Sequence, residues 1–97
     1  MPSVKNILDE RGEIYGEFLP LADVAQAIKR AYVRGDRWRH LAADQKEALE
    51  LIATKVARIV SKSPDHTDSW ADIAGYATLV AERLDYESPL TFGNSRE

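Results

Sequence analysis

The sequence has no cysteine and no long apolar run, and each absence removes a class of protein. Without cysteine, disulfides, thiolate metal sites and cysteine nucleophiles are excluded. No stretch approaches the 18 apolar residues of a membrane-spanning helix, and no basic segment followed by an apolar core opens the chain as in a signal peptide. We therefore expect a cytoplasmic protein that has no membrane partner.

The sequence also lacks a large excess of basic over acidic residues, or of acidic over basic ones. The 97 residues carry 13 basic and 16 acidic side chains, a net charge of −3, so general nucleic-acid binding is not expected. Hydrophobic residues make up 44% and charged residues 30%, as in ordinary soluble domains. We expect one helical domain over residues 1–86. Residues 87–97 contain turn formers without periodicity and are predicted to be a disordered tail.

The spacing of apolar residues predicts an all-α fold of about four helices and no strands. The predicted helices span residues 3–11, 21–34, 44–62 and 68–85. Two glycines and a proline predict a loop over residues 12–20. Asp44 and Glu47 resemble a capping box at the start of the third helix. Short connections favour an antiparallel bundle in which the third and fourth helices form a hairpin.

Two pairs of carboxylates lie about one turn apart on consecutive predicted helices. Glu47 and Glu50 belong to the third helix, and Asp68 and Asp72 belong to the fourth. Four carboxylates at this spacing can converge on a divalent cation such as Mg²⁺, which takes oxygen ligands and often works with substrate phosphates. The same residues can instead cap helices or complement the positive end of a helix dipole.

The acid-bearing faces also carry residues that do not suit free solvent. Leu51 lies beside the first pair, and Leu79 lies beside the second. Gly75 shares the face of Asp72, where glycine costs about 1 kcal/mol relative to alanine. Close approach of another helix or of a ligand explains such a glycine. We expect these faces to meet each other, the N-terminal segment or a second subunit, in a homo-oligomer that is a dimer or larger.

Three strings in the sequence together resemble a known family. ERG..YG.F at residues 10–18, EALELIATKVARI at 47–59 and DSWADIAGYA at 68–77 are similar to an uncharacterised phage and prophage family of small helical domains. That family in turn resembles, at a distance, the MazG-like all-α nucleoside triphosphate pyrophosphatases. It also resembles phage domains that are associated with nucleotide modification.

The resemblance implies a nucleotide ligand and a Mg²⁺ cofactor, with Mn²⁺ as a substitute. MazG-like enzymes release pyrophosphate from nucleoside triphosphates, and here the substrate would include modified deoxynucleotides. Their ExxE and ExxD pairs bind the metal, which assigns catalytic and metal-binding roles to Glu47, Glu50, Asp68 and Asp72. The second pair departs from the pattern because its members are four residues apart, although this spacing also keeps both on one helix face.

Five other residues are candidates for substrate binding: Lys55, Arg58, Tyr15, Gly16 and Tyr76. Lys55 and Arg58 can neutralise charge on pyrophosphate, or can serve as surface side chains and salt-bridge partners of the acids. Tyr15 and Gly16 can receive a stacked base, or can close the end of the bundle. Tyr76 lies near the acid face, where it can contact a ligand or a partner helix.

Trp38 stands among basic residues in the connector before the third helix. It can stack on a ligand, or it can fasten the connector to the next helix.

Two other functional hypotheses stay open beside the enzyme. One is a non-catalytic protein that binds or sequesters a nucleotide, and the other is a structural protein that oligomerises through the acid faces.

Overall fold

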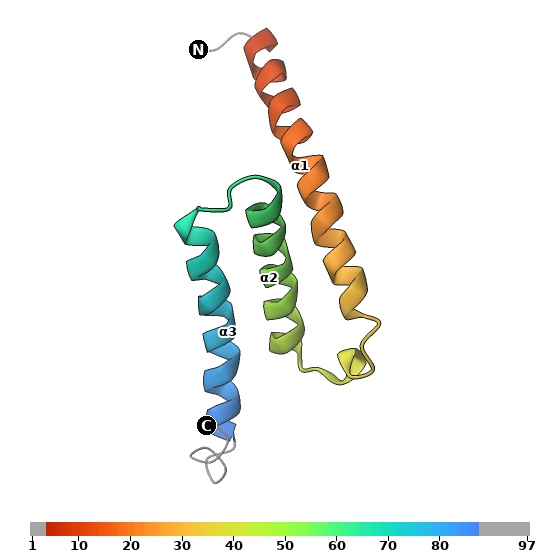
Figure 1. The fold of residues 1–97 in the computed structure, drawn as a ribbon, viewed down its shortest axis with the longest axis vertical. Coiled ribbons are helices and arrows are strands. Elements are labelled where there is room, and N and C mark those ends of the chain that lie inside the picture. Colours follow the sequence, from red (N-terminus) through yellow and green to blue (C-terminus); the bar gives the residue numbers. More distant parts are fainter. Residues whose placement is uncertain (1–3, 88–97) are drawn as a thin grey trace.

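The computed structural model describes residues 4–87 as three α-helices joined by two turns (Figure 1). The elements are α1 (Val4–Tyr32), the 3₁₀ turn η1 (Trp38–His40), α2 (Ala43–Ser61) and α3 (Thr67–Glu87). Side chains are described for residues 17–87. No strand occurs between residues 4 and 87, which confirms the all-α class. The predicted tail lies outside the described residues, except for Glu87 at the end of α3.

Helix α1 replaces the first two predicted helices and the loop between them. The prediction of a loop over residues 12–20 was wrong, because these residues are helical, with Pro20 inside the helix. In a helix interior a glycine costs about 1 kcal/mol and a proline about 3 kcal/mol. Packing offsets part of this cost. Leu21, directly after Pro20, and Ala25, one turn later, are buried in a cluster with Ala57 of α2. The described chain therefore has three α-helices where four were expected.

Helix α2 lies between α1 and α3, and both neighbours run antiparallel to it (Figure 1). The predicted hairpin of the last two helices is thus confirmed as α2–α3. The three helices form a layer that is one helix thick. The radius of gyration is 18.1 Å, against about 12.5 Å for a compact domain of this length. Neither face of this layer is covered by a further helix from residues 4–87.

The core is small and rich in alanine. Ala53 and Ala57 are 0% exposed, and the short side chain of Ala57, which packs with Leu21 and Ala25, lets α1 approach α2 closely. Several large apolar side chains are exposed instead: Phe18, Leu19, Val33, Val60, Trp70, Leu79, Leu84 and Tyr86. The described residues of one chain therefore leave much of their apolar surface uncovered.

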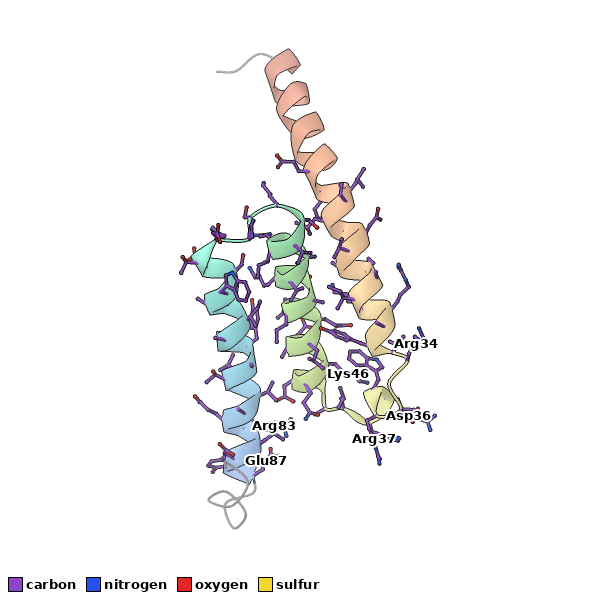
Figure 2. All side chains as sticks on the ribbon, in the orientation of Figure 1. Arg34, Asp36, Arg37, Lys46, Arg83 and Glu87 are labelled. Atoms are coloured by element: carbon purple, nitrogen blue, oxygen red, sulfur yellow. The ribbon has the colours of Figure 1, made fainter. Side chains whose placement is uncertain are left out.

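Trp38 fastens the turn between α1 and α2. Its ring stacks on Tyr32 with centroids 5.6 Å apart, and Lys46 Nζ lies 5.9 Å from the centroid of the Trp38 ring. Figure 2 labels Lys46 on α2. The Tyr32 hydroxyl donates a hydrogen bond to the Leu49 carbonyl at 2.9 Å. Burial raises the pKa of Tyr32. These contacts favour the structural role of Trp38 over a stacking site for a ligand.

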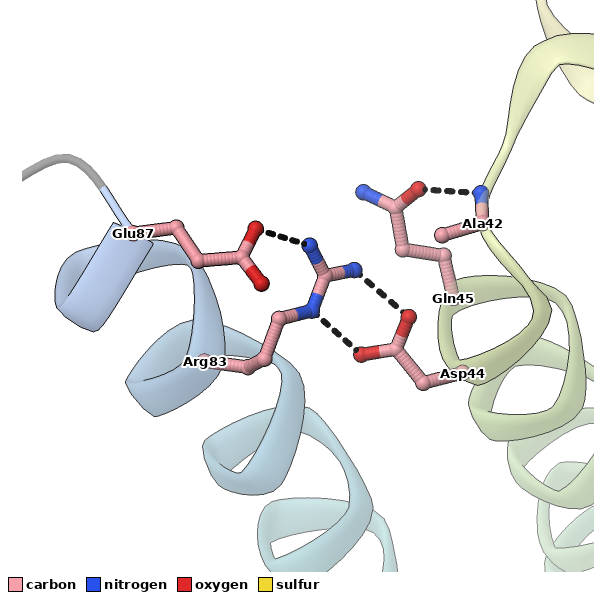
Figure 3. A network of polar contacts seen from close by, with 5 residues as sticks. All are labelled: Ala42, Asp44, Gln45, Arg83 and Glu87. Carbon is pink, nitrogen blue, oxygen red and sulfur yellow. Dashed lines mark hydrogen bonds and ion pairs between the residues drawn. The ribbon is translucent and has the colours of Figure 1, made fainter.

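The first turn of α2 is joined to the last turns of α3 by an arginine (Figure 3). Arg83 Nε donates to Asp44 Oδ2 at 2.9 Å, and Nη2 donates to Oδ1 at 2.5 Å. Nη1 of Arg83 donates to Glu87 at 3.0 Å. This bidentate geometry is the specific form of an arginine–carboxylate pair.

The predicted capping box of Asp44 and Glu47 is not formed. Helix α2 begins one residue earlier than expected, with Ala42 at the N-cap. Gln45 is therefore the third helical residue, and its Oε1 accepts a hydrogen bond from the Ala42 N–H at 2.8 Å (Figure 3). Asp44 is left to pair with Arg83.

The ion pair predicts a pH dependence of stability. The hydrogen bond from Arg83 lowers the pKa of Asp44 in the folded chain. A carboxyl with a lowered folded pKa contributes stability above its unfolded pKa, about 3.9, and this contribution is lost as the pH falls through the folded pKa. We expect Asp44→Asn to melt below wild type at about pH 7, and the gap to close at about pH 2.

Thermal melts followed by circular dichroism measure this gap. Asp65→Asn, in the α2–α3 loop, removes a carboxylate without touching Arg83 and is expected to melt like wild type at both pH values. A gap for Asp44→Asn that stays constant from neutral to acidic pH would count against the pair.

Candidate functional site

The four predicted metal ligands lie at different heights along the α2–α3 hairpin. Lys55 Nζ binds Asp72 Oδ2 at 2.8 Å, so Asp72 is level with Lys55. Along α2, Glu50 lies about 7.5 Å and Glu47 about 12 Å from that level, at 1.5 Å per residue. Asp68 lies about one turn beyond Asp72, in the direction away from Glu47, because the helices are antiparallel. The register of the hairpin thus offsets the two acid pairs.

The described residues do not fit the Mg²⁺ site that the family resemblance implies. Between residues 17 and 87, no three Asp, Glu or His side chains come close enough to hold a metal ion. The carboxylate of Asp72 is occupied by the ammonium of Lys55, in a pair whose side chains are 44% and 21% exposed. No catalytic step through a metal can be derived from this arrangement. The four-carboxylate site therefore stays a prediction.

A shallow groove nevertheless runs between α2 and α3 on the side that carries acidic residues. It is lined by Asp44, Glu47, Ala48 and Leu51 from α2 and by Tyr76, Leu79, Val80 and Arg83 from α3. The predicted ligand residue Tyr76 thus lines the same groove as Glu47. Gly75 lies on the adjoining outer surface of α3, where a Cβ would meet nothing within 4 Å. The close approach expected at Gly75 is not made by any residue between 17 and 87, because neither α1 nor α2 covers that surface there.

A second pocket gathers basic side chains where α1 passes the α2–α3 loop. Its volume is about 370 Å³. It is lined by Glu17, Phe18 and Leu21 from α1 and by Arg58, Lys62, Ser63 and His66 from the end of α2 and the loop. We call it the loop pocket. It exists because α1 is continuous through residues 12–20 and so reaches past the end of α2.

Two cationic side chains from the end of α2 line the loop pocket, and within residues 17–87 only one of them has an ion-pair partner. Lys62 Nζ pairs with Glu17 Oε2 at 2.8 Å, which ties α1 to the end of α2. Arg58 is half-buried and makes no ion pair with another residue of the range 17–87. Its carbonyl accepts a hydrogen bond from the Lys62 N–H at 2.9 Å. His66 Nδ1 lies 3.2 Å from Ser69 Oγ, in a contact that orients the ring.

The structure separates the predicted substrate-binding residues. Arg58 lies in the loop pocket, whereas Lys55 and Tyr76 lie on the hairpin. Tyr15 and Gly16 directly precede Glu17 on α1, but their side chains lie outside the described residues.

From the end of α2 and the loop, sequence reasoning found Arg58 but missed the other three members of the pocket, Lys62, Ser63 and His66. One signal was present in the sequence, because Arg58 and Lys62 are one helical turn apart immediately before a polar loop. This signal alone does not predict a pocket, because one wall of the pocket is formed by α1 at Glu17, Phe18 and Leu21. The sequence analysis expected residues 12–20 to be a loop, which would not form that wall.

The fold and the loop pocket define a small all-α domain with a basic recess. The chain belongs to the family described as a domain of unknown function, DUF6378, which matches residues 3–84. No curated protein and no solved structure matches the chain. None of the described helices is long and apolar enough to cross a membrane.

Proposed function

We propose that this protein binds a nucleotide through its phosphates in the loop pocket. The observation that carries the proposal is Arg58, a half-buried guanidinium without an ion-pair partner among residues 17–87. Guanidinium groups bind phosphate oxygens through two parallel hydrogen bonds. Lys62 and His66 line the same recess and add donors for a second phosphate.

An aromatic ring lies at the same pocket and suits the base of a nucleotide. The Phe18 side chain is 54% exposed, although it is large and apolar. Stacking of a base on such a ring is worth about 1–3 kcal/mol. A pocket of about 370 Å³ is within the size range of small-molecule sites. The predicted contacts of a base with Tyr15 and Gly16, one turn earlier on α1, remain part of this proposal.

The MazG-like resemblance adds the proposal that the ligand is a triphosphate, including modified deoxynucleotides, in a phage or prophage setting. It also adds hydrolysis to release pyrophosphate. Hydrolysis is supported by the carboxylates of Glu47 on α2 and Asp72 on α3, which line adjoining grooves on one side of the hairpin. The offset of Asp72 from Glu50 and its pairing with Lys55 favour the alternative, a protein that binds or sequesters the nucleotide without cleaving it.

Isothermal titration calorimetry tests the proposal with a panel of nucleoside mono-, di- and triphosphates, each with and without Mg²⁺. We expect affinity to rise with the number of phosphates, because each adds acceptors for Arg58 and Lys62. Absence of binding across the panel would reject the proposed function. Pyrophosphate release measured in the same samples separates the hydrolase from the sequestering protein.

A further inference from the structure

One row of exposed residues on α3 is covered by no other helix of the described chain, and only Trp70 at its start is held to the α2–α3 loop, by a hydrogen bond from its Nε1 to the Pro64 carbonyl at 2.9 Å. Its five members follow one another at spacings of four, three, four and three residues: Trp70, Ala74, Ala77, Ala81 and Leu84. This is the seven-residue repeat of a helix–helix interface. All five are exposed, with Trp70 at 56% and Leu84 at 42%. We call this row the α3 seam.

The α3 seam is separate from the side of α3 that packs on α2. Five of the seven buried or half-buried residues of α3 follow another row along the helix: Ser69, Ile73, Tyr76, Val80 and Arg83. An apolar groove continues the seam toward α2, where Leu49 and Ile52 of α2 and Leu41, just before it, line the groove with Ala77 and Val80. The groove lies on the opposite side of the hairpin from the groove that Glu47 lines, because successive helical residues advance by about 100°. This face of the layer is therefore apolar as well as open.

We infer that the α3 seam binds the α3 seam of a second copy of this chain, antiparallel, about a two-fold axis at Ala77. A two-fold interface must be complementary to itself. The seam meets this condition, because its large residues Trp70 and Leu84 stand at equal distances, seven residues, on either side of Ala77. Rotation about Ala77 places Trp70 against Leu84 of the partner subunit.

The small residues at the centre of the seam suit this arrangement. Alanines at positions 74, 77 and 81 let two helix backbones approach closely, while the larger side chains fill the space at each end. A helix with large residues at its centre would not fit on this surface without leaving gaps beside the alanines. The partner surface that fits best is another row with the same order of sizes.

Charge does not oppose the pairing. The charged residues of α3 between Trp70 and Leu84 all fall outside the row, and two of them are turned to α2. Asp72 pairs there with Lys55, and Arg83 pairs with Asp44. Two copies can therefore bring their seams together without placing like charges opposite each other.

The size of the core explains why the partner is a second copy. Only six apolar residues are buried among residues 17–87, and four of them are alanine: Leu21, Ala25, Ala48, Ala53, Ala57 and Ile59. This core buries little apolar surface for 97 residues, so apolar burial against a second copy would add to the stability of the fold. A second copy is present wherever the chain is made. The interface then lies on the apolar side of the hairpin, whereas the sequence had suggested the acid side.

Light scattering on the purified full chain tests the proposal. We expect the mass of a dimer for wild type and the mass of a monomer for Ala77→Glu, which places two carboxylates on the axis. Ala71→Glu adds the same charge on an exposed part of α3 outside the seam and is expected to remain dimeric. Circular dichroism confirms that each variant is helical. A monomeric wild type, or an Ala77→Glu variant that stays dimeric, would overturn the inference.

A cysteine scan locates the axis, because the natural chain has no cysteine. Ala77→Cys is expected to form a disulfide-linked dimer when a mild oxidant removes the two thiol hydrogens, since a disulfide requires Cα atoms within about 7 Å. Ala71→Cys should stay unlinked under the same conditions. Dimers by light scattering without a disulfide at Ala77→Cys would show that another surface mediates pairing and would reject the α3 seam.

Discussion

Replacement of Ala57 by aspartate is expected to abolish the folded state. Ala57 is 0% exposed and lies in the cluster of α1 and α2 with Leu21 and Ala25. A carboxylate at this position would lose its water without gaining a partner within that cluster. The penalty is several kcal/mol, whether the group stays charged or takes up a proton. Small domains have a total stability of only about 5–15 kcal/mol, and this core is small for a chain of its length.

Thermal unfolding followed by circular dichroism measures this effect. Wild type should show a cooperative transition, and Ala57→Asp should show a low helical signal without one. Ala71→Asp is the matched control, because Ala71 is exposed on α3 and the change has the same intrinsic helix cost, up to about 0.7 kcal/mol. It should unfold cooperatively at a slightly lower temperature. If both variants unfolded alike, the contact between α1 and α2 would not be the core of this fold.

The sequence predicted α2 and α3 well and α1 poorly, for one physical reason. Helices α2 and α3 have clear start and stop signals and begin and end within about two residues of their predicted bounds. In α1, Gly12, Gly16 and Pro20 oppose a helix locally. The packing of α1 on α2 that offsets them lies more than 30 residues away in sequence, as Leu21 with Ala57 shows. A window of local sequence does not contain that contact.

For the candidate site, the sequence predicted which face of its helix each acid residue occupies. It did not predict how far apart the two acid pairs lie along the axis of the α2–α3 hairpin. Periodicity places Glu47 and Asp72 on particular faces of their helices, and both faces border the grooves on one side of the hairpin. It does not give the axial offset of α3 against α2, which depends on the five-residue turn 62–66 and on side-chain packing. Each residue of offset moves a carboxylate by about 1.5 Å. An offset of five residues between Glu50 and the level of Asp72 is therefore enough to separate the acid pairs.

Arg58→Glu is expected to weaken nucleotide binding at least about a hundredfold. Hydrogen bonds to charged groups are worth about 1.5–3 kcal/mol each, and a guanidinium in the loop pocket can make two to a phosphate. The new carboxylate would also repel the phosphates. Isothermal titration with the nucleotide that binds wild type most tightly measures the loss. Circular dichroism checks the fold, since an acid in the last turn of α2 costs about 0.3–1 kcal/mol through the helix dipole.

The matched control for this prediction is Arg34→Glu, which changes net charge by the same amount at the other end of the layer. Arg34 lies at the turn after α1, where Figure 2 shows it far from the α2–α3 loop. Binding by Arg34→Glu should stay within about twofold of wild type, because charges separated by more than about 10 Å are largely screened in ordinary buffer. Equal losses in the two variants would mean that overall charge attracts the nucleotide, and the loop pocket would then be the wrong site. Arg58→Lys should retain part of the affinity, because it keeps the charge but loses the second hydrogen bond.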